Sequence, residues 1–189
     1  MGQIQPIPTT YKGYRFRSRL EARWAVFFDV MGIKYEYEPE GFSMDYGIRY
    51  LPDFALHNVL WRGQNAFHYT GKPSNPVFVE IKGADRYSDI PYKDRIKMEM
   101  FASSYPLLIL GNIPEDVCDE MQEHSGDGIM NYRFLDGDSY PCFFSKHDGN
   151  IWLCGPDHEE FHPWTTDEAI TIAKMSRFEY GESPVTERI

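Results

Sequence analysis

The sequence predicts an α/β fold in which two helices pack against a mixed central sheet. Residues 18–31 carry apolar side chains at helical spacing. Three short runs that contain β-branched or aromatic residues are typical of strands, and a fourth run, at residues 106–112, is typical of a strand buried on both faces because it is apolar. A second helical pattern separates the last two runs. With 189 residues, of which 42% are hydrophobic and 16% aromatic, the chain is long enough for one domain with a substantial core.

The expected elements follow the order helix, strand, strand, strand, helix, strand. They are expected at residues 18–31, 33–38, 49–56, 77–83, 92–104 and 106–112. The apolar face of the first helix consists of Leu20, Trp24, Phe27, Phe28 and Met31. Gly32 ends that helix, and the second helix is expected to turn Ile96, Met100 and Phe101 inward. Residues 1–11 are expected to be irregular, and residues 57–76 to form a loop or a small hairpin.

The chain changes character after this core, which we place at residues 1–112. Residues 113–189 are expected to form an acidic α+β extension packed on the core. It would contain an acidic helix at 115–124, two or three antiparallel strands within 131–154 with turns at Gly137 and Gly149, and a last helix at 166–180.

The net charge of −10 is unevenly distributed. Residues 1–105 carry 14 Lys and Arg against 12 Asp and Glu, whereas residues 106–189 carry 5 against 17. The first part contains a basic cluster opposed by Glu21 alone, made of Lys12, Arg15, Arg17, Arg19 and Arg23. Such a local patch can attract phosphates even on an acidic protein, because screening confines the field to about 8–10 Å. A solvated helix start is the alternative interpretation.

The stretch "VFVEIKG", residues 77–83, ends an apolar strand in two charges. Side chains alternate across a strand, so Glu80 and Lys82 point to one face. A plain salt bridge between them is one interpretation. However, Asp53 on the preceding strand can approach Glu80, and two carboxylates in one place repel and would share a proton unless a cation joined them. Mg²⁺ or Mn²⁺ bound by Asp53, Glu80 and the Ile81 carbonyl would suit this arrangement.

Two further residues complete the candidate site. Lys82 would lie beside the metal-bound water, and its pKa should fall there, so that it can orient or deprotonate the water. Glu21 lies at the edge of the buried helix face and can reach into the same cleft. Ser18 and Glu21 also form a capping-box pattern, in which Glu21 would instead accept a hydrogen bond from the Ser18 amide.

Other candidates concern phosphate and zinc. Lys93 and Lys97, one helical turn apart, are candidate DNA contacts, and solvent-facing lysines are the alternative. A zinc site built from Cys142, Cys154, His158 and His162 is disfavoured, because its first ligand pair is too widely spaced. No catalytic triad, phosphate-binding loop or dinucleotide fingerprint occurs in the sequence.

Three stretches in order, "FRSRLEARWAVFF", "YLPDFAL" and "VFVEIKG", resemble the PD-(D/E)xK nuclease superfamily over residues 14–112. More narrowly, they are similar to small nucleases encoded by bacteriophages and prophages. The resemblance implies a restriction-endonuclease-like core. It also implies that Asp53 and Glu80 are metal ligands, that Lys82 is the catalytic lysine, and that Glu21 is the acidic residue contributed by the helix. The 57–76 insert makes the gap between Asp53 and Glu80 longer than a tight hairpin needs.

The resulting expectation is a Mg²⁺- or Mn²⁺-dependent endonuclease that hydrolyses DNA. Arg15, Arg17, Arg19, Lys93 and Lys97 would contact the DNA, and a homodimer would provide two active sites for two strands. The alternatives are an RNA-directed nuclease and a catalytically silent protein of the same fold that binds DNA or a host factor. No apolar run can span a bilayer and the three cysteines cannot all pair, so we expect no membrane partner and a cytoplasmic location, in the bacterial host if the protein is phage-encoded.

Overall fold

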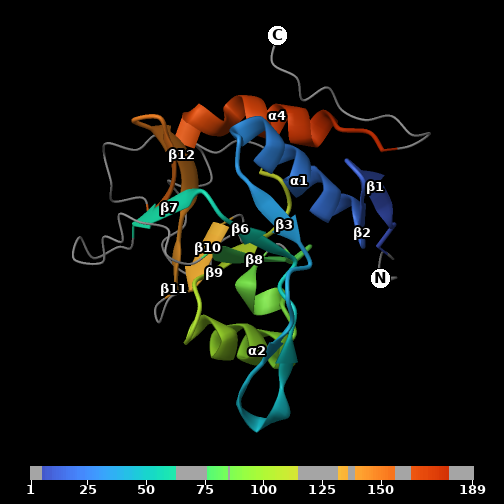
Figure 1. Cartoon of the computed structure of the whole chain (residues 1–189), viewed down its shortest axis with the longest axis vertical. Coiled ribbons are helices and arrows are strands. Elements are labelled where there is room, and N and C mark those ends of the chain that lie inside the picture. Colours follow the sequence, from blue (N-terminus) through green and yellow to red (C-terminus); the bar gives the residue numbers. More distant parts are fainter. Residues whose placement is uncertain are drawn as a thin grey trace.

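A central six-stranded sheet, in the order β11-β10-β9-β8-β6-β3, organises the protein. In the computed structural model, which describes residues 6–62, 76–84, 86–114, 132–135, 139–155 and 163–178, α1 and α4 cover one face of this sheet and α2 the other (Figure 1). The helices are α1 (Arg19–Met31), α2 (Tyr92–Ala102) and α4 (Asp167–Met175). The sheet strands are β3 (Tyr35–Tyr37), β6 (Phe54–Leu56), β8 (Val77–Ile81), β9 (Leu107–Leu110), β10 (Tyr132–Leu135) and β11 (Ser139–Pro141).

The pairing of the strands follows from the way the chain connects them. β3, β6 and β8 are antiparallel neighbours, with Tyr37 opposite Phe54 and Phe54 opposite Val79. β8 and β9 are parallel, because α2 carries the chain back across the sheet between them. The expected order of helix, three strands, helix and strand is therefore observed, and the prediction of an α/β fold with a mixed sheet is confirmed.

Helix α1 begins and ends where the sequence predicts. Ser18 is its N-cap, and its hydroxyl accepts a hydrogen bond from the Glu21 amide at 3.1 Å. Gly32 ends the helix in the left-handed region, with φ 77°, which glycine adopts without a steric penalty. Four of the five residues of the predicted apolar face are buried, and Trp24, Phe27 and Phe28 are 0% exposed, whereas Leu20 is half-buried.

We expect Ser18→Ala to lower the free energy of unfolding by about 1 kcal/mol, the usual cost of losing an N-cap. Urea denaturation measures this loss through the transition midpoint. Ser104→Ala is the matched control, since Ser104 is exposed after α2, and it should change the stability by less than about 0.5 kcal/mol. Equal losses in the two variants would show that the cap contributes nothing.

Alternation along the central strands divides the core into two clusters. Val77 and Val79 of β8 pack in the cluster beneath α1, and Phe78 packs in the cluster against α2. The prediction of the inward face of α2 is partly wrong: Met98 and Phe101 are buried, whereas Ile96 and Met100 are half-buried. Polar and apolar side chains are mixed around this helix, so the sequence is a weak guide to which of its faces is buried.

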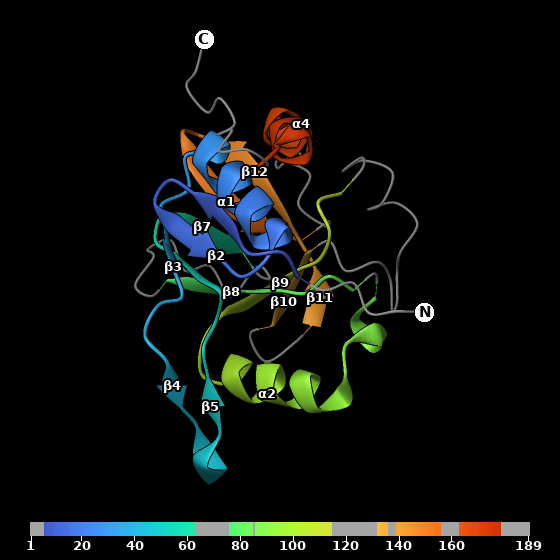
Figure 2. The same ribbon diagram turned by 90° about the vertical axis from the view of Figure 1, so that its right-hand side faces the viewer.

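Two local predictions at the N-terminal end are wrong. Residues predicted to be irregular belong to a hairpin of β1 (Thr9–Tyr11) and β2 (Tyr14–Phe16), turned by Lys12 and Gly13, both with positive φ. The strand expected at 49–56 is divided into β5 (Arg49–Tyr50) and β6. Pro52 lies between them and has no amide hydrogen for a sheet ladder. β5 instead pairs with β4 (Phe42–Ser43) in a hairpin that extends past α2 (Figure 2).

The described residues after 112 add strands to two sheets. β10 and β11 extend the central sheet beyond β9, and α4 packs beside α1 (Figure 1). β12 (Phe143–His147) and β13 (Asn150–Cys154) form a further hairpin, and β13 pairs in parallel with β7 (Val59–Arg62). Four strands occur here, not two or three.

Several C-terminal predictions can be compared only in part. The turn at Gly149 is confirmed, since Asp148 and Gly149 both have positive φ. The last helix is observed as α4 and ends at Met175, before the predicted residue 180. The helix expected at 115–124 and the turn at Gly137 lie outside the described residues, and the domain boundary at 112 stays a prediction. In the described part of the chain, no helix has the length and apolar character that crossing a membrane requires.

Candidate active site

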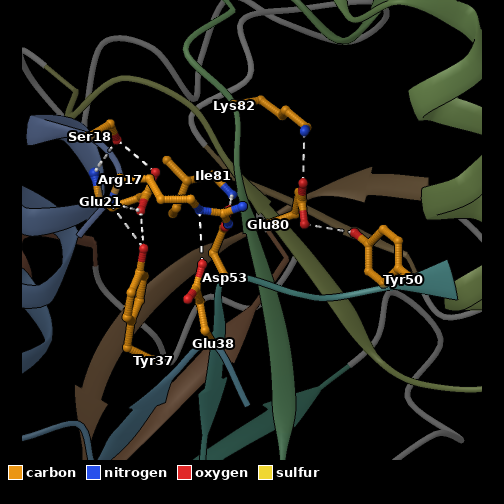
Figure 3. Close-up of polar contacts among 10 residues, drawn as sticks. All are labelled: Arg17, Ser18, Glu21, Tyr37, Glu38, Tyr50, Asp53, Glu80, Ile81 and Lys82. Carbon is orange, nitrogen blue, oxygen red and sulfur yellow. Dashed lines mark hydrogen bonds and ion pairs between the residues drawn. The ribbon is translucent and has the colours of Figure 1, made fainter. Parts of the chain in front are cut away.

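Two buried carboxylates meet at the end of the central sheet. Phe54 is opposite Val79, and the Asp53 amide bonds to the Val79 carbonyl at 2.9 Å, which brings Asp53 alongside Glu80 on the adjacent strand. The exposed fractions are 4% for Asp53 and 9% for Glu80. The sequence-based expectation that these two strands bring the two acids together is therefore met (Figure 3).

Asp53 is held from two directions. Its Oδ2 accepts a hydrogen bond from the Ile81 amide at 2.7 Å, which fixes the carboxylate against the end of β8. Its Oδ1 forms an ion pair with the Arg17 guanidinium, and Arg17 Nε also lies 3.0 Å from Glu38 Oε1. The Arg17 side chain is 56% exposed, so Arg17 joins the buried Asp53 to Glu38 at the protein surface.

Glu80 has two partners on the α2 side of the sheet. Lys82 Nζ lies 2.7 Å from Glu80 Oε1, as the shared strand face requires. The Tyr50 hydroxyl donates to Glu80 Oε2 at 2.9 Å. Burial raises the pKa of Tyr50 and the adjacent Glu80 acts in the same direction, so the phenol keeps its proton and remains a donor.

Glu21 lies on the opposite side of Asp53 and is 7% exposed. Its carboxylate accepts hydrogen bonds from the Tyr37 hydroxyl at 2.6 Å, the Ser18 hydroxyl at 2.8 Å and the Arg17 amide at 3.0 Å. The capping interpretation is thus partly right, but the amide that Glu21 caps belongs to Arg17, the residue before Ser18. Glu21 and Asp53 share Arg17, through its backbone and its guanidinium respectively.

The crowding of acids changes the ionisation of Asp53. Burial raises the pKa of Asp53 to about 8, and the charges of Glu80 and Glu21 add to the increase. The Ile81 amide and the Arg17 guanidinium lower the pKa but do not outweigh these causes. The direction of this shift shows that the three acids together repel one another more than Arg17 compensates, so additional positive charge beside Asp53 would be favourable.

This raised pKa makes stability depend on pH. Between about pH 4 and pH 8 the folded protein keeps a proton on Asp53 that the unfolded chain releases. The resulting contribution to stability is complete below pH 4 and is lost as the pH rises through 8, with a slope of at most about 1.4 kcal/mol per pH unit. Urea denaturation from pH 5 to 9 should show this decline in the wild type and a flatter profile in Asp53→Asn. Parallel curves of stability against pH in the two proteins would contradict this role of Asp53.

The pKa of Lys82 is set by two opposing causes. Burial alone would lower it, but the charge and hydrogen bond of Glu80 outweigh burial and raise it, with weaker help from Asp53 and Asp94. Glu80 has this effect because it interacts with the ammonium group itself. The sequence-based expectation of a lowered pKa concerns a lysine beside a bound cation, and it stays a prediction.

The donor set fits a hard divalent cation. Asp53, Glu80 and Glu21 are three buried acids, and carboxylate and carbonyl oxygens are the ligands that Mg²⁺ and Mn²⁺ prefer. Among the described residues, no three His, Cys, Asp or Glu side chains form a ready-made metal-binding group. Arg17 forms an ion pair with Asp53, and Lys82 forms one with Glu80. A bound metal would have to displace these two basic side chains from the acids.

Comparison with known proteins leaves the family open. No family model, curated protein or solved structure matches this chain. The interpretation of the site therefore rests on its own geometry.

The predicted DNA contacts divide between the two sides of the site. Arg15 on β2 is exposed, and Arg19, which begins α1, is half-buried. The Arg17 guanidinium forms ion pairs with Asp53 and Glu38. Lys93 and Lys97 are both exposed on α2, beyond the opposite face of the sheet. The basic residues thus flank Asp53 and Glu80 instead of forming one continuous patch.

Two of the four residues of the disfavoured zinc site lie in the described part of the chain. Cys142 and Cys154 are buried thiols at neighbouring ends of the β12–β13 hairpin, and they form no disulfide with each other. His158 and His162 lie outside the described residues, as does Cys118.

Tyr37, Tyr50 and Glu38 also belong to the site, although the sequence analysis did not select them. Each contacts a partner far along the chain: Tyr50 is 30 residues from Glu80 and Tyr37 is 16 from Glu21. No short motif contains both members of either pair. The sequence offered one weak signal. Tyr37 and Tyr50 lie in predicted strands, and the hydroxyl of a buried tyrosine usually forms a hydrogen bond with a polar partner.

Proposed function

We propose that the protein is a divalent-metal-dependent endonuclease that hydrolyses phosphodiester bonds in DNA. The observation that carries the proposal is the meeting of Asp53 and Glu80 on adjacent strands, with Lys82 bonded to Glu80. The order of helix, three strands, helix and strand supports a restriction-endonuclease-like core. It also supports the resemblance of residues 14–112 to the PD-(D/E)xK superfamily and its small phage- and prophage-encoded nucleases.

In this proposal, different residues bind the metal ion and transfer the proton. Asp53 and Glu80, with the Ile81 carbonyl, would hold a Mg²⁺ or Mn²⁺ ion, which when bound supplies charge stabilisation at the phosphoryl oxygens. The Ile81 amide keeps Asp53 oriented, and Tyr50 does the same for Glu80.

Lys82 would orient the attacking water and accept its proton. Its pKa is raised, chiefly because the attraction of Glu80 outweighs burial. A cation held by Glu80 would weaken this attraction, and burial would then lower the pKa. Lys82 would therefore be a better base with the cation bound.

Incubation with a panel of linear, branched and single-stranded DNA, and with matched RNA, tests the proposal. We expect cutting of DNA in Mg²⁺ or Mn²⁺ and none after chelation with EDTA. Internal cuts in a closed circular substrate would establish an endonuclease. Preference for RNA would redirect the proposal to an RNA-directed nuclease, and failure to cut any substrate would contradict it.

A second candidate is a protein of the same fold that binds DNA or a host factor without chemistry. The observation that favours it is that Arg17 and Lys82 already neutralise Asp53 and Glu80. A titration with Mg²⁺ followed by thermal unfolding separates the two candidates. A silent binder should show no stabilisation by the cation, whereas the proposed nuclease should be stabilised.

A further inference from the structure

A cleft beside the candidate active site contains basic residues that its chemistry does not use. It encloses about 190 Å³ between β5 and α2 and opens next to Glu80 and Lys82. Its charged lining residues are Arg49, Glu80, Lys82, Asp94 and Lys97. The cleft therefore begins at the catalytic lysine and continues towards α2.

The charges in this cleft do not all pair with one another. Lys82 is paired with Glu80, which leaves Arg49 and Lys97 facing the single carboxylate of Asp94. Within the described ranges, neither Arg49 nor Lys97 forms an ion pair, and both side chains belong to exposed residues. The cleft thus carries an excess of one positive charge over its carboxylates, before any metal is bound.

Packing places Arg49 in a defined position. The next residue, Tyr50, is buried, and its ring lies 4.6 Å from that of Phe101 on α2. The Tyr50 hydroxyl is bonded to Glu80 at 2.9 Å. The strand that carries Arg49 is therefore anchored to both the helix that carries Lys97 and the candidate active site.

We propose that Arg49 and Lys97 bind a second phosphate of the nucleic-acid backbone, next to the phosphate that is cleaved. The inference rests on the proposed function, because it takes the site at Glu80 and Lys82 to hold the reacting phosphate. A guanidinium fork and an ammonium group on opposite walls suit a phosphate diester, whose oxygens accept hydrogen bonds from several directions. Such a contact positions the substrate without reading its sequence.

The salt dependence of binding tests this subsite. Anisotropy of labelled duplex and single-stranded oligonucleotides would be measured at several salt concentrations with Ca²⁺ in place of Mg²⁺. Wild type would be compared with Arg49→Ala, Lys97→Ala and the charge-keeping Arg49→Lys. Lys174→Ala, which removes an exposed lysine on α4 across the sheet, is the matched control. Cutting by each protein would be followed separately in Mg²⁺.

Each alanine variant should bind several-fold more weakly and lose about 0.9 from the slope of log affinity against log salt on duplex, or about 0.7 on a single strand. Arg49→Lys should keep most of the slope, and Lys174→Ala all of it. Unchanged slopes in both alanine variants, equal losses in the control, or no binding by wild type would overturn the subsite. If wild type binds but does not cut, the proposed function fails, and the slopes still decide the subsite.

Discussion

Lys82→Ala is expected to lower the rate of DNA cleavage by about 10²- to 10⁴-fold, the usual contribution of a general base. Lys82 Nζ lies 2.7 Å from Glu80 and is half-buried at the end of β8, next to both acids. Alanine removes the group that, in the proposed mechanism, orients and deprotonates the water. Because the proposed DNA contacts are other residues, the loss should appear in the rate constant for cleavage measured under single-turnover conditions.

Lys82→Arg distinguishes the possible roles of the lysine. Arginine keeps the positive charge beside Glu80 but cannot lose its proton at any working pH. The proposed base role predicts that Lys82→Arg is as inactive as Lys82→Ala. Lys174→Ala is the control and should cut at the wild-type rate. Normal cutting by Lys82→Ala would remove the lysine from the mechanism.

Asp53→Ala is expected to abolish stabilisation by divalent cations. A ligand at 100 times its dissociation constant stabilises the folded state by about 2.7 kcal/mol. For a domain of this size, this free energy corresponds to a rise in Tm of about 5–11 °C in the wild type. Asp53 is one of the two central ligands of the proposed metal site, so its removal should leave the Tm unchanged by Mg²⁺ or Mn²⁺. Thermal unfolding in a series of cation concentrations measures the difference.

Glu38→Gln is the matched control for this loss of stabilisation. Glu38 also contacts Arg17, at 3.0 Å, but its side chain is 38% exposed and lies outside the proposed ligand set. The variant should keep the full shift in Tm. If Asp53→Ala kept the shift as well, the cation would bind elsewhere on the protein.

Much of the α1 region is predictable because its determinants are local. Ser18 at the start, an apolar residue at every third or fourth position, and Gly32 at the end all lie within one helix. The approach of Asp53 to Glu80 is also predictable, since alternation along two adjacent strands leaves few arrangements. These features need no knowledge of distant contacts.

The features that the sequence did not indicate depend on contacts between distant residues. Pro52 indicates an interruption of the strand, but nothing near it shows that the chain leaves one sheet after Tyr50 and joins another at Phe54. The basic cluster predicted Arg17 as a DNA contact, whereas its guanidinium is bonded to Asp53, 36 residues away. The raised pKa of Lys82 likewise depends on whether Glu80 faces the ammonium or a metal, which spacing alone cannot decide.

The claim on which this account depends is that Asp53 and Glu80 together hold a divalent cation. Its most direct test is anomalous scattering from a crystal of the wild-type protein saturated with Mn²⁺. We predict an anomalous peak within about 2.2 Å of carboxylate oxygens of both residues, with Arg17 withdrawn from Asp53. Manganese bound elsewhere, with the Arg17–Asp53 and Lys82–Glu80 pairs both intact, would contradict it.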